Sequence, residues 1–140
     1  MYKRQGDITA ALNPKKINRV VFCSGKVYYD LLEQKEQKQL SNVAIIRVEQ
    51  LYPFPVEPIK KQLQLYGQAE VVWCQEEPKN MGAWSFVAPL FEELLLQQKH
   101  RSTRAFYAGR AAAASPATGS MKRHELEQAQ LVNIALTGKE

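Results

Sequence analysis

The stretch VVWCQEEPKNMGAW, residues 71–84, begins as an apolar run and continues through two glutamates, a proline, a lysine, an asparagine and a glycine. Its β-branched and aromatic start predicts a strand over 70–75 that is buried on both faces. Strands of this kind belong to parallel sheets covered by helices. The polar residues that follow would then lie at the carboxyl end of the strand, where such sheets meet ligands and partners.

The same alternation of apolar runs and amphipathic segments recurs along the chain. The predicted strands are at 19–24, 42–51, 70–75 and 104–109. The predicted helices are at 26–40, 58–67, 82–98 and 122–136, each with its apolar residues on one face. Strand followed by helix, four times over, predicts an α/β fold with three layers, in which a mostly parallel sheet lies between two layers of helices.

The domain organisation follows from where this alternation begins. Residues 1–18 are polar, carry Gly6 and Pro14, and show no periodicity. We therefore expect residues 1–18 to be a lead-in from a preceding domain, and residues 19–140 to form one α/β domain. A chain of 140 residues, 45% of them hydrophobic, is large enough to form its own core.

Charge and composition exclude several functional classes. The net charge is +5, but the basic residues come as scattered pairs among glutamates, which argues against nucleic-acid binding and suits an anionic ligand or an acidic partner. No apolar run is long enough for a membrane span, and no signal-type segment begins the chain, so we expect a cytoplasmic protein, or a mitochondrial-matrix one in a eukaryote. Cys23 and Cys74 lie in apolar runs without a CxxC motif, which predicts buried thiols and no metal site.

Two of the segments that follow predicted strands have distinctive chemistry. Ser24, Gly25 and Lys26 open a helix, so they form either an anion site or a plain strand-to-helix turn. Tyr52 and Phe54 alternate with prolines in a rigid apolar loop. That loop either folds onto its own domain or presents a docking surface.

The other two segments carry most of the charge at this edge. Glu76 and Glu77 suit a basic partner, a cap or acid/base chemistry, whereas Asn80 is expected to cap the next helix and Trp84 to pack beneath it. Arg110 is the only charged residue of an alanine-rich loop, where it could contact a carboxylate or phosphate, or where the alanines could let another chain pack closely. These residues do not form a self-contained catalytic set.

These loops also carry a resemblance to a known family. CSGKVYYDLL, VAIIRVEQLYPFP, VVWCQEEPKNMGAW and YAGRAAAASPATGSMKRHE occur in this order, and from about Arg19 to Leu136 the chain resembles the carboxy-terminal domain of 2-oxoglutarate dehydrogenase, the thiamine-dependent first component of its complex. The resemblance implies a transketolase C-terminal-like fold within a much longer homodimeric parent enzyme.

The resemblance also implies the activity of that parent, an oxidoreductase of a multienzyme complex. The parent binds thiamine diphosphate and magnesium between its preceding domains, and decarboxylates 2-oxoglutarate. It then succinylates the lipoyl group of dihydrolipoyl succinyltransferase in the citric acid cycle. The GDG…N segment that holds the cofactor in this family does not occur here, so we expect neither a cofactor nor catalytic residues in this chain.

The expected role is therefore that of a structural and dimerising domain, inactive alone, whose strand-end loops face the preceding domains and the second subunit. The expected interface residues are Tyr52, Phe54, Glu76, Glu77, Asn80, Trp84, Arg110 and Ser115. The alternative is a regulatory domain that binds an adenine nucleotide or acetyl-CoA. The residues expected to bind such an effector are Ser24, Gly25, Lys26 and Arg110.

Overall fold

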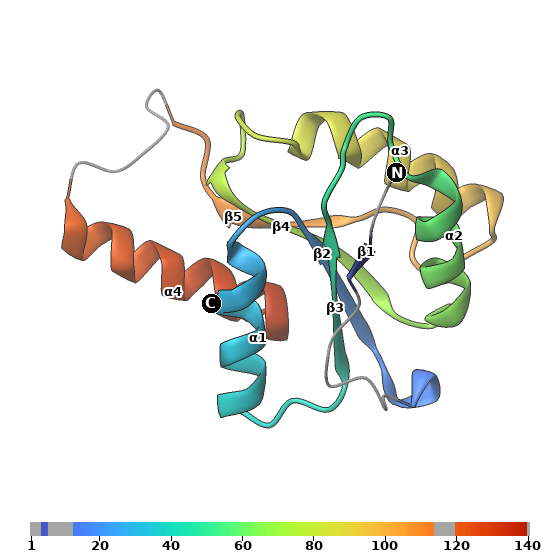
Figure 1. Ribbon diagram of the computed structural model, residues 1–140, viewed down its shortest axis with the longest axis horizontal. Coiled ribbons are helices and arrows are strands. Elements are labelled where there is room, and N and C mark those ends of the chain that lie inside the picture. The colour runs from blue at the N-terminus through green and yellow to red at the C-terminus, as the bar shows by residue number, and fades with distance from the viewer. Residues whose placement is uncertain (1–3, 6–12, 114–119, 140) are drawn as a thin grey trace.

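The computed structural model describes residues 4–5, 13–113 and 120–139, which form an α/β domain around one sheet (Figure 1). The strands lie in the order β1-β3-β2-β4-β5, and all but β1 are parallel to one another. Their bounds are Arg4–Gln5 (β1), Arg19–Cys23 (β2), Val43–Val48 (β3), Glu70–Pro78 (β4) and Phe106–Arg110 (β5).

The helices form a layer on each side of this sheet, as Figure 1 shows. Helices α1 and α4 cover one face, and α2 and α3 cover the other. Their bounds are Val27–Gln37 (α1), Val56–Leu65 (α2), Trp84–Gln97 (α3) and Met121–Thr137 (α4), with a short 3-10 helix at Pro14–Lys16. The predicted three-layer fold with a mostly parallel sheet is confirmed. None of the described helices has the length and apolarity needed to cross a membrane.

Alternation along the strands divides the apolar residues between two cores. Phe22 and Trp73 pack toward α2 and α3, whereas Cys23 and Cys74 pack toward α1 and α4. Each central strand therefore needs apolar side chains on both faces, which explains the unbroken apolar runs in the sequence.

The segment expected to be a lead-in contributes to this sheet. Arg4 and Gln5 pair antiparallel with Val48 and Arg47, and Ile17 is buried in the core next to α2 and α3. Arg4, where β1 begins, pairs with Val48, where β3 ends. Strand β1 therefore begins at the carboxyl end of the parallel strands.

A topological switch point lies between β2 and β4. These strands are neighbours in the sheet, but β2 leads to α1 on one face and β4 leads to α3 on the other. The two chain segments that leave the sheet here diverge, and a crevice opens between them. Ligands of open α/β sheets commonly bind at this position.

The two cysteines are neighbours in the middle of the sheet. Cys23 of β2 is the register partner of Cys74 of β4, and both are buried and free, as the apolar runs predict. Burial raises the pKa of the Cys74 thiol to about 12, and burial also raises the pKa of Cys23 well above its ordinary range. Both groups therefore stay protonated, and reagents reach them only when the sheet opens.

We expect neither thiol of the folded chain to react with a chromogenic disulfide reagent at pH 8, because the reactive thiolate is neither formed nor exposed. Both should react at once after unfolding in urea. The absorbance of the coloured thiolate that the reagent releases measures the reaction directly. Rapid modification of either cysteine under native conditions would contradict the buried arrangement.

Candidate functional site

One buried side chain, that of Gln75, organises the loop between β4 and α3. Its Oε1 accepts hydrogen bonds from the Trp73 indole N–H (3.0 Å) and the Trp84 backbone N–H (2.9 Å). Its Nε2 lies within hydrogen-bond distance of three backbone carbonyls, those of Glu77 (3.1 Å) and Pro78 (3.0 Å) at the end of β4 and that of Met81 (2.8 Å) in the loop. A single carboxamide thus fixes the end of the strand, the turn and the start of the helix.

The sequence analysis did not single out Gln75, although the sequence holds a signal for it. In the strand 70–75, Gln75 is in phase with Val71 and Trp73, so it points to the same buried face. A polar residue in phase with a core face must find hydrogen-bond partners inside the protein. That requirement explains why the polar loop follows the strand so closely.

The expected capping role of Asn80 is wrong. The residue before α3 is Ala83, which makes no side-chain cap, and the Trp84 N–H bonds to Gln75 instead. The Asn80 carboxamide pairs with the backbone of Ala113, donating to its carbonyl (2.8 Å) and accepting from its N–H (3.0 Å). Asn80 therefore ties the β4–α3 loop to the segment after β5.

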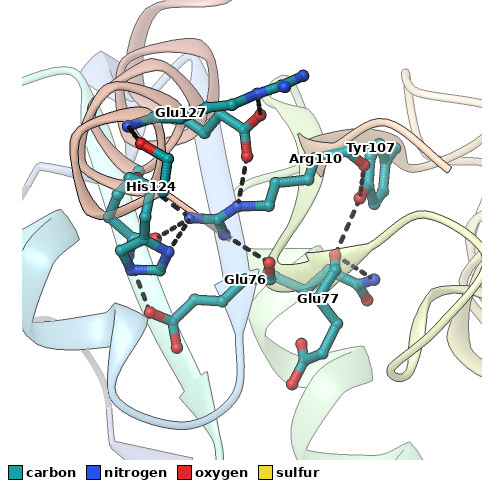
Figure 2. A network of polar contacts seen from close by, with 10 residues as sticks. Glu76, Glu77, Tyr107, Arg110, His124 and Glu127 are labelled. Carbon is teal, nitrogen blue, oxygen red and sulfur yellow. Dashed lines mark hydrogen bonds and ion pairs between the residues drawn. The ribbon is translucent and has the colours of Figure 1, made fainter. Parts of the chain in front are cut away.

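Arg110, at the end of β5, is the centre of a second polar network, shown in Figure 2. Its side chain is only 8% exposed and pairs with Glu127 of α4 (3.1 Å). It also donates to the Glu76 backbone carbonyl (2.6 Å) and to the Gln128 side chain (2.9 Å), and it lies 3.3 Å from His124 Nδ1. The guanidinium is thus surrounded by partners from its own domain.

Glu76 takes part in the same network. The Gln128 Nε2 donates to Glu76 Oε1 (2.9 Å) and to Asp30 Oδ2 of α1 (2.8 Å). The network therefore joins β4, β5, α1 and α4 at one point. Glu127, Gln128 and His124 were not among the predicted site residues, because nothing in the spacing of α4 shows that they meet Arg110.

Tyr107 and Gly109 complete the end of β5. The Tyr107 hydroxyl lies 2.6 Å from the Arg110 carbonyl, and burial raises its pKa to about 12, which keeps it protonated as a donor. A Cβ at Gly109 would lie 2.5 Å from that hydroxyl oxygen and 2.9 Å from the Gln75 carbonyl oxygen. No side chain fits at residue 109 unless this end of β5 moves.

A hollow of about 490 Å³ lies at the switch point between β2 and β4. Its walls come from the ends of both strands, from the β3–α2 loop and from the start of α3. The lining residues are Ser24, Gly25, Leu51, Tyr52, Trp73, Gln75, Glu77, Gly82, Ala83 and Phe86. Glu77 is the charged residue among them, and the rest of the wall is largely aromatic and aliphatic.

The apolar loop divides its two aromatic residues between the domain and the surface. Phe54 packs against the core and forms an edge-to-face pair with Phe91, with ring centroids 5.8 Å apart. Tyr52 is 83% exposed, and Phe86, which follows the apolar pattern of the predicted helix, is 40% exposed beside it. The loop therefore folds onto its own domain through Phe54, and the docking role of Tyr52 stays a prediction.

The remaining predicted residues have mixed surroundings. Trp84 is half-buried against Tyr107, and Glu77 is exposed. Of the residues expected to bind an effector, Ser24 and Gly25 line the hollow, Lys26 is exposed outside its lining, and Arg110 belongs to the internal network. Ser115 lies outside the described residues.

A family model described as 2-oxoglutarate dehydrogenase C-terminal matches residues 3–136. The chain belongs to this family. The matched residues include both edge strands of the sheet, β1 and β5, together with the hollow and the Arg110 network.

Two relatives in the 2-oxoglutarate dehydrogenase C-terminal family illustrate the scale of the parent proteins. The chain is 54% identical over 121 residues to the 2-oxoglutarate dehydrogenase E1 components of Brucella anthropi and Brucella ovis. The aligned region covers 86% of this chain but 12% of each relative. The chain thus spans only a small part of the length of these relatives.

Replacing Gln75 with leucine should lower the free energy of unfolding by about 3 kcal/mol, because two N–H donors and three carbonyls would lose a buried partner. Urea unfolding followed by tryptophan fluorescence measures the change. Gln64→Leu, on the exposed surface of α2, is the matched control and should stay within about 0.5 kcal/mol. Equal stability of the two variants would contradict the organising role of Gln75.

Gln75→Glu separates hydrogen bonding from packing. A carboxylate would face three carbonyl oxygens, which raises its pKa in the folded chain above the unfolded value. The protonated acid can donate a hydrogen bond. The free energy of unfolding of the variant should therefore rise, relative to that of the unsubstituted chain, as pH falls through the raised pKa. Unfolding curves between about pH 7 and pH 4.5 test this. An unchanged difference across that range would contradict the assigned hydrogen bonds.

Arg110→Lys should cost about 2 kcal/mol in unfolding free energy, because an ammonium cannot reach all the groups that the guanidinium joins. Arg123→Lys is the matched control, since Arg123 pairs with the other oxygen of Glu127 but is 73% exposed. The control should change stability by less than about 0.5 kcal/mol. Urea unfolding measures the stability of both variants. A loss of unfolding free energy in the control as large as that in Arg110→Lys would argue against a buried network.

Proposed function

We propose that this chain is the C-terminal structural and dimerisation domain of a 2-oxoglutarate dehydrogenase E1 component, and that its strand-end surface is covered by other parts of that enzyme. The observation that carries the proposal is the hollow with exposed Tyr52 and Phe86 on its wall. An exposed aromatic wall beside a loop that is held by internal hydrogen bonds is typical of a protein contact surface.

We propose that the acids and the arginine at this edge serve contacts rather than catalysis. The Arg110 guanidinium and the Glu76 carboxylate serve contacts within the domain. Among the described residues no group of three or more His, Cys, Asp or Glu side chains could hold a metal ion, so these residues do not fit a magnesium site. We infer that thiamine diphosphate and magnesium are bound by other domains of the parent enzyme.

The proposed parent decarboxylates 2-oxoglutarate and succinylates the lipoyl group of dihydrolipoyl succinyltransferase, within the multienzyme complex of the citric acid cycle. It acts as a homodimer in the cytoplasm, or in the mitochondrial matrix of a eukaryote. In this proposal the C-terminal domain supports the preceding domains and the second subunit. The Gln75 and Arg110 networks keep the contact surface rigid before assembly, which reduces the entropy lost on binding.

The alternative, an anionic effector at the strand-end edge, finds less support in the geometry. The charged lining residue of the hollow is Glu77, which repels an anion, and the Arg110 guanidinium is already surrounded by partners. Adenine nucleotide or acetyl-CoA binding at Ser24, Gly25, Lys26 and Arg110 therefore stays a prediction.

A chimera tests the proposed function. The matched segment of the Brucella anthropi E1 component is replaced with this chain, and 2-oxoglutarate decarboxylation is measured with thiamine diphosphate and magnesium. We expect an active chimera, no activity from this chain alone, and no activity from the relative truncated before the segment. Full activity of the truncated relative, or a dimeric but inactive chimera, would contradict the proposal.

A further inference from the structure

Glu76 and Glu77 are adjacent in sequence but differ in their surroundings. The Glu76 carboxylate accepts a hydrogen bond from Gln128. The Glu77 carboxylate points away from the network in Figure 2, and no N–H or O–H group of the described residues donates to it. Its backbone carbonyl is held by Gln75, which places the residue at the edge of the hollow, and among the described residues no ion pair to its carboxylate is found.

We propose that the switch-point hollow receives a positively charged side chain, an arginine or a lysine, from the part of the E1 polypeptide that precedes this chain. The proposal rests on the proposed function and names the chemistry of the contact. Glu77 would pair with the cationic group, and the aromatic wall would pack against its aliphatic stem.

The lining explains why a basic side chain fits best. Tyr52 and Phe86 form a tilted ring pair at the exposed rim, with centroids 6.4 Å apart and planes inclined by 55°, and their exposed ring surface is available to a cation. Long basic side chains combine an apolar stem with a charged end, and guanidinium groups also stack on aromatic rings. An anion would meet Glu77, and a purely apolar side chain would leave Glu77 desolvated without a partner.

The direction of β1 explains why the occupant comes from the preceding polypeptide. Arg4, where β1 begins, pairs with Val48 at the carboxyl end of β3. The chain therefore enters this domain on the edge of the sheet where the hollow opens. The relatives are far longer than this chain, which covers 12% of their length, so most of such a polypeptide lies outside this domain.

Recognition of a cation by the hollow is tested on this chain alone. N-acetyl-arginine amide is titrated while the backbone and indole N–H signals are followed by NMR. We expect saturable shifts at Gly25, Gly82 and the Trp73 indole. N-acetyl-citrulline amide, which has the same length without the charge, should bind about fivefold more weakly or not at all.

Two variants, each of which removes one negative charge, test the role of Glu77. Glu77→Gln should weaken arginine amide binding about fivefold, whereas Glu92→Gln, an exposed acid of α3 outside the lining, should leave it unchanged. The absence of saturable shifts at the hollow, equal binding of citrulline amide, or equal loss in both variants would overturn the proposal.

The source of the cation is tested in the chimera described above. Carboxylates are activated with a carbodiimide in the presence of glycine amide, and modified residues are identified by mass spectrometry. Glu77 should be modified in the chain alone. In the chimera its modification should fall at least about tenfold, or Glu77 should be cross-linked to a lysine of the preceding domains. Modification of Glu92 serves as the control for equal exposure to the reagent. Cross-linking of Glu77 to another copy of this chain, or unchanged reactivity, would overturn the assignment.

The two proposals can fail separately. An active chimera with freely reactive Glu77 would keep the proposed function and remove the cation contact. An inactive chimera with protected Glu77, together with charge-dependent binding of arginine amide, would keep the contact and remove the proposed function.

Discussion

The carboxamide of Gln75 is the constraint on which the strand-end edge depends. It continues the buried face of β4 beyond the last apolar residue, and its two ends satisfy donors and acceptors from both sides of the turn. Buried polar groups of this kind specify one arrangement, because any other leaves several of them without partners. The turn is thus held from within, and its outer side is free to form the wall of a hollow.

The different surroundings of the two neighbouring glutamates follow from the geometry of an extended chain. Consecutive residues of a strand point to opposite faces, so Glu76 turns toward α1 and α4, and Glu77 toward the side of α2 and α3. On the first side, Arg110, Gln128 and Asp30 have assembled a network that includes Glu76. On the second side lies the hollow. Of the two adjacent acids, Glu76 thereby stabilises the domain internally, and Glu77 contributes to the exposed surface.

The sequence was informative where a property repeats along the chain. Apolar periodicity gave the strands, the helices and the layer order, because burial imposes a regular pattern on each element. It did not give β1, whose two residues are too few to show a period. It also gave no sign that α4 would bring Glu127 and Gln128 to Arg110, since that meeting depends on how the helix crosses the sheet. Asn80 fits the composition of a helix cap, but a competing partner, Gln75, had already satisfied the helix N–H group.

The position of α4 has a consequence for the order in which the protein can form during synthesis. This helix follows all five strands in sequence, yet Leu131, Val132, Ala135 and Leu136 cover apolar residues of the central strands. Until this helix has left the ribosome, one face of the sheet has only α1 to cover it, and Arg110 lacks its ion-pair partner Glu127. Nascent chains with bare sheet faces are prone to association. Correct folding of this domain therefore has to wait until α4 emerges and completes the second helix layer.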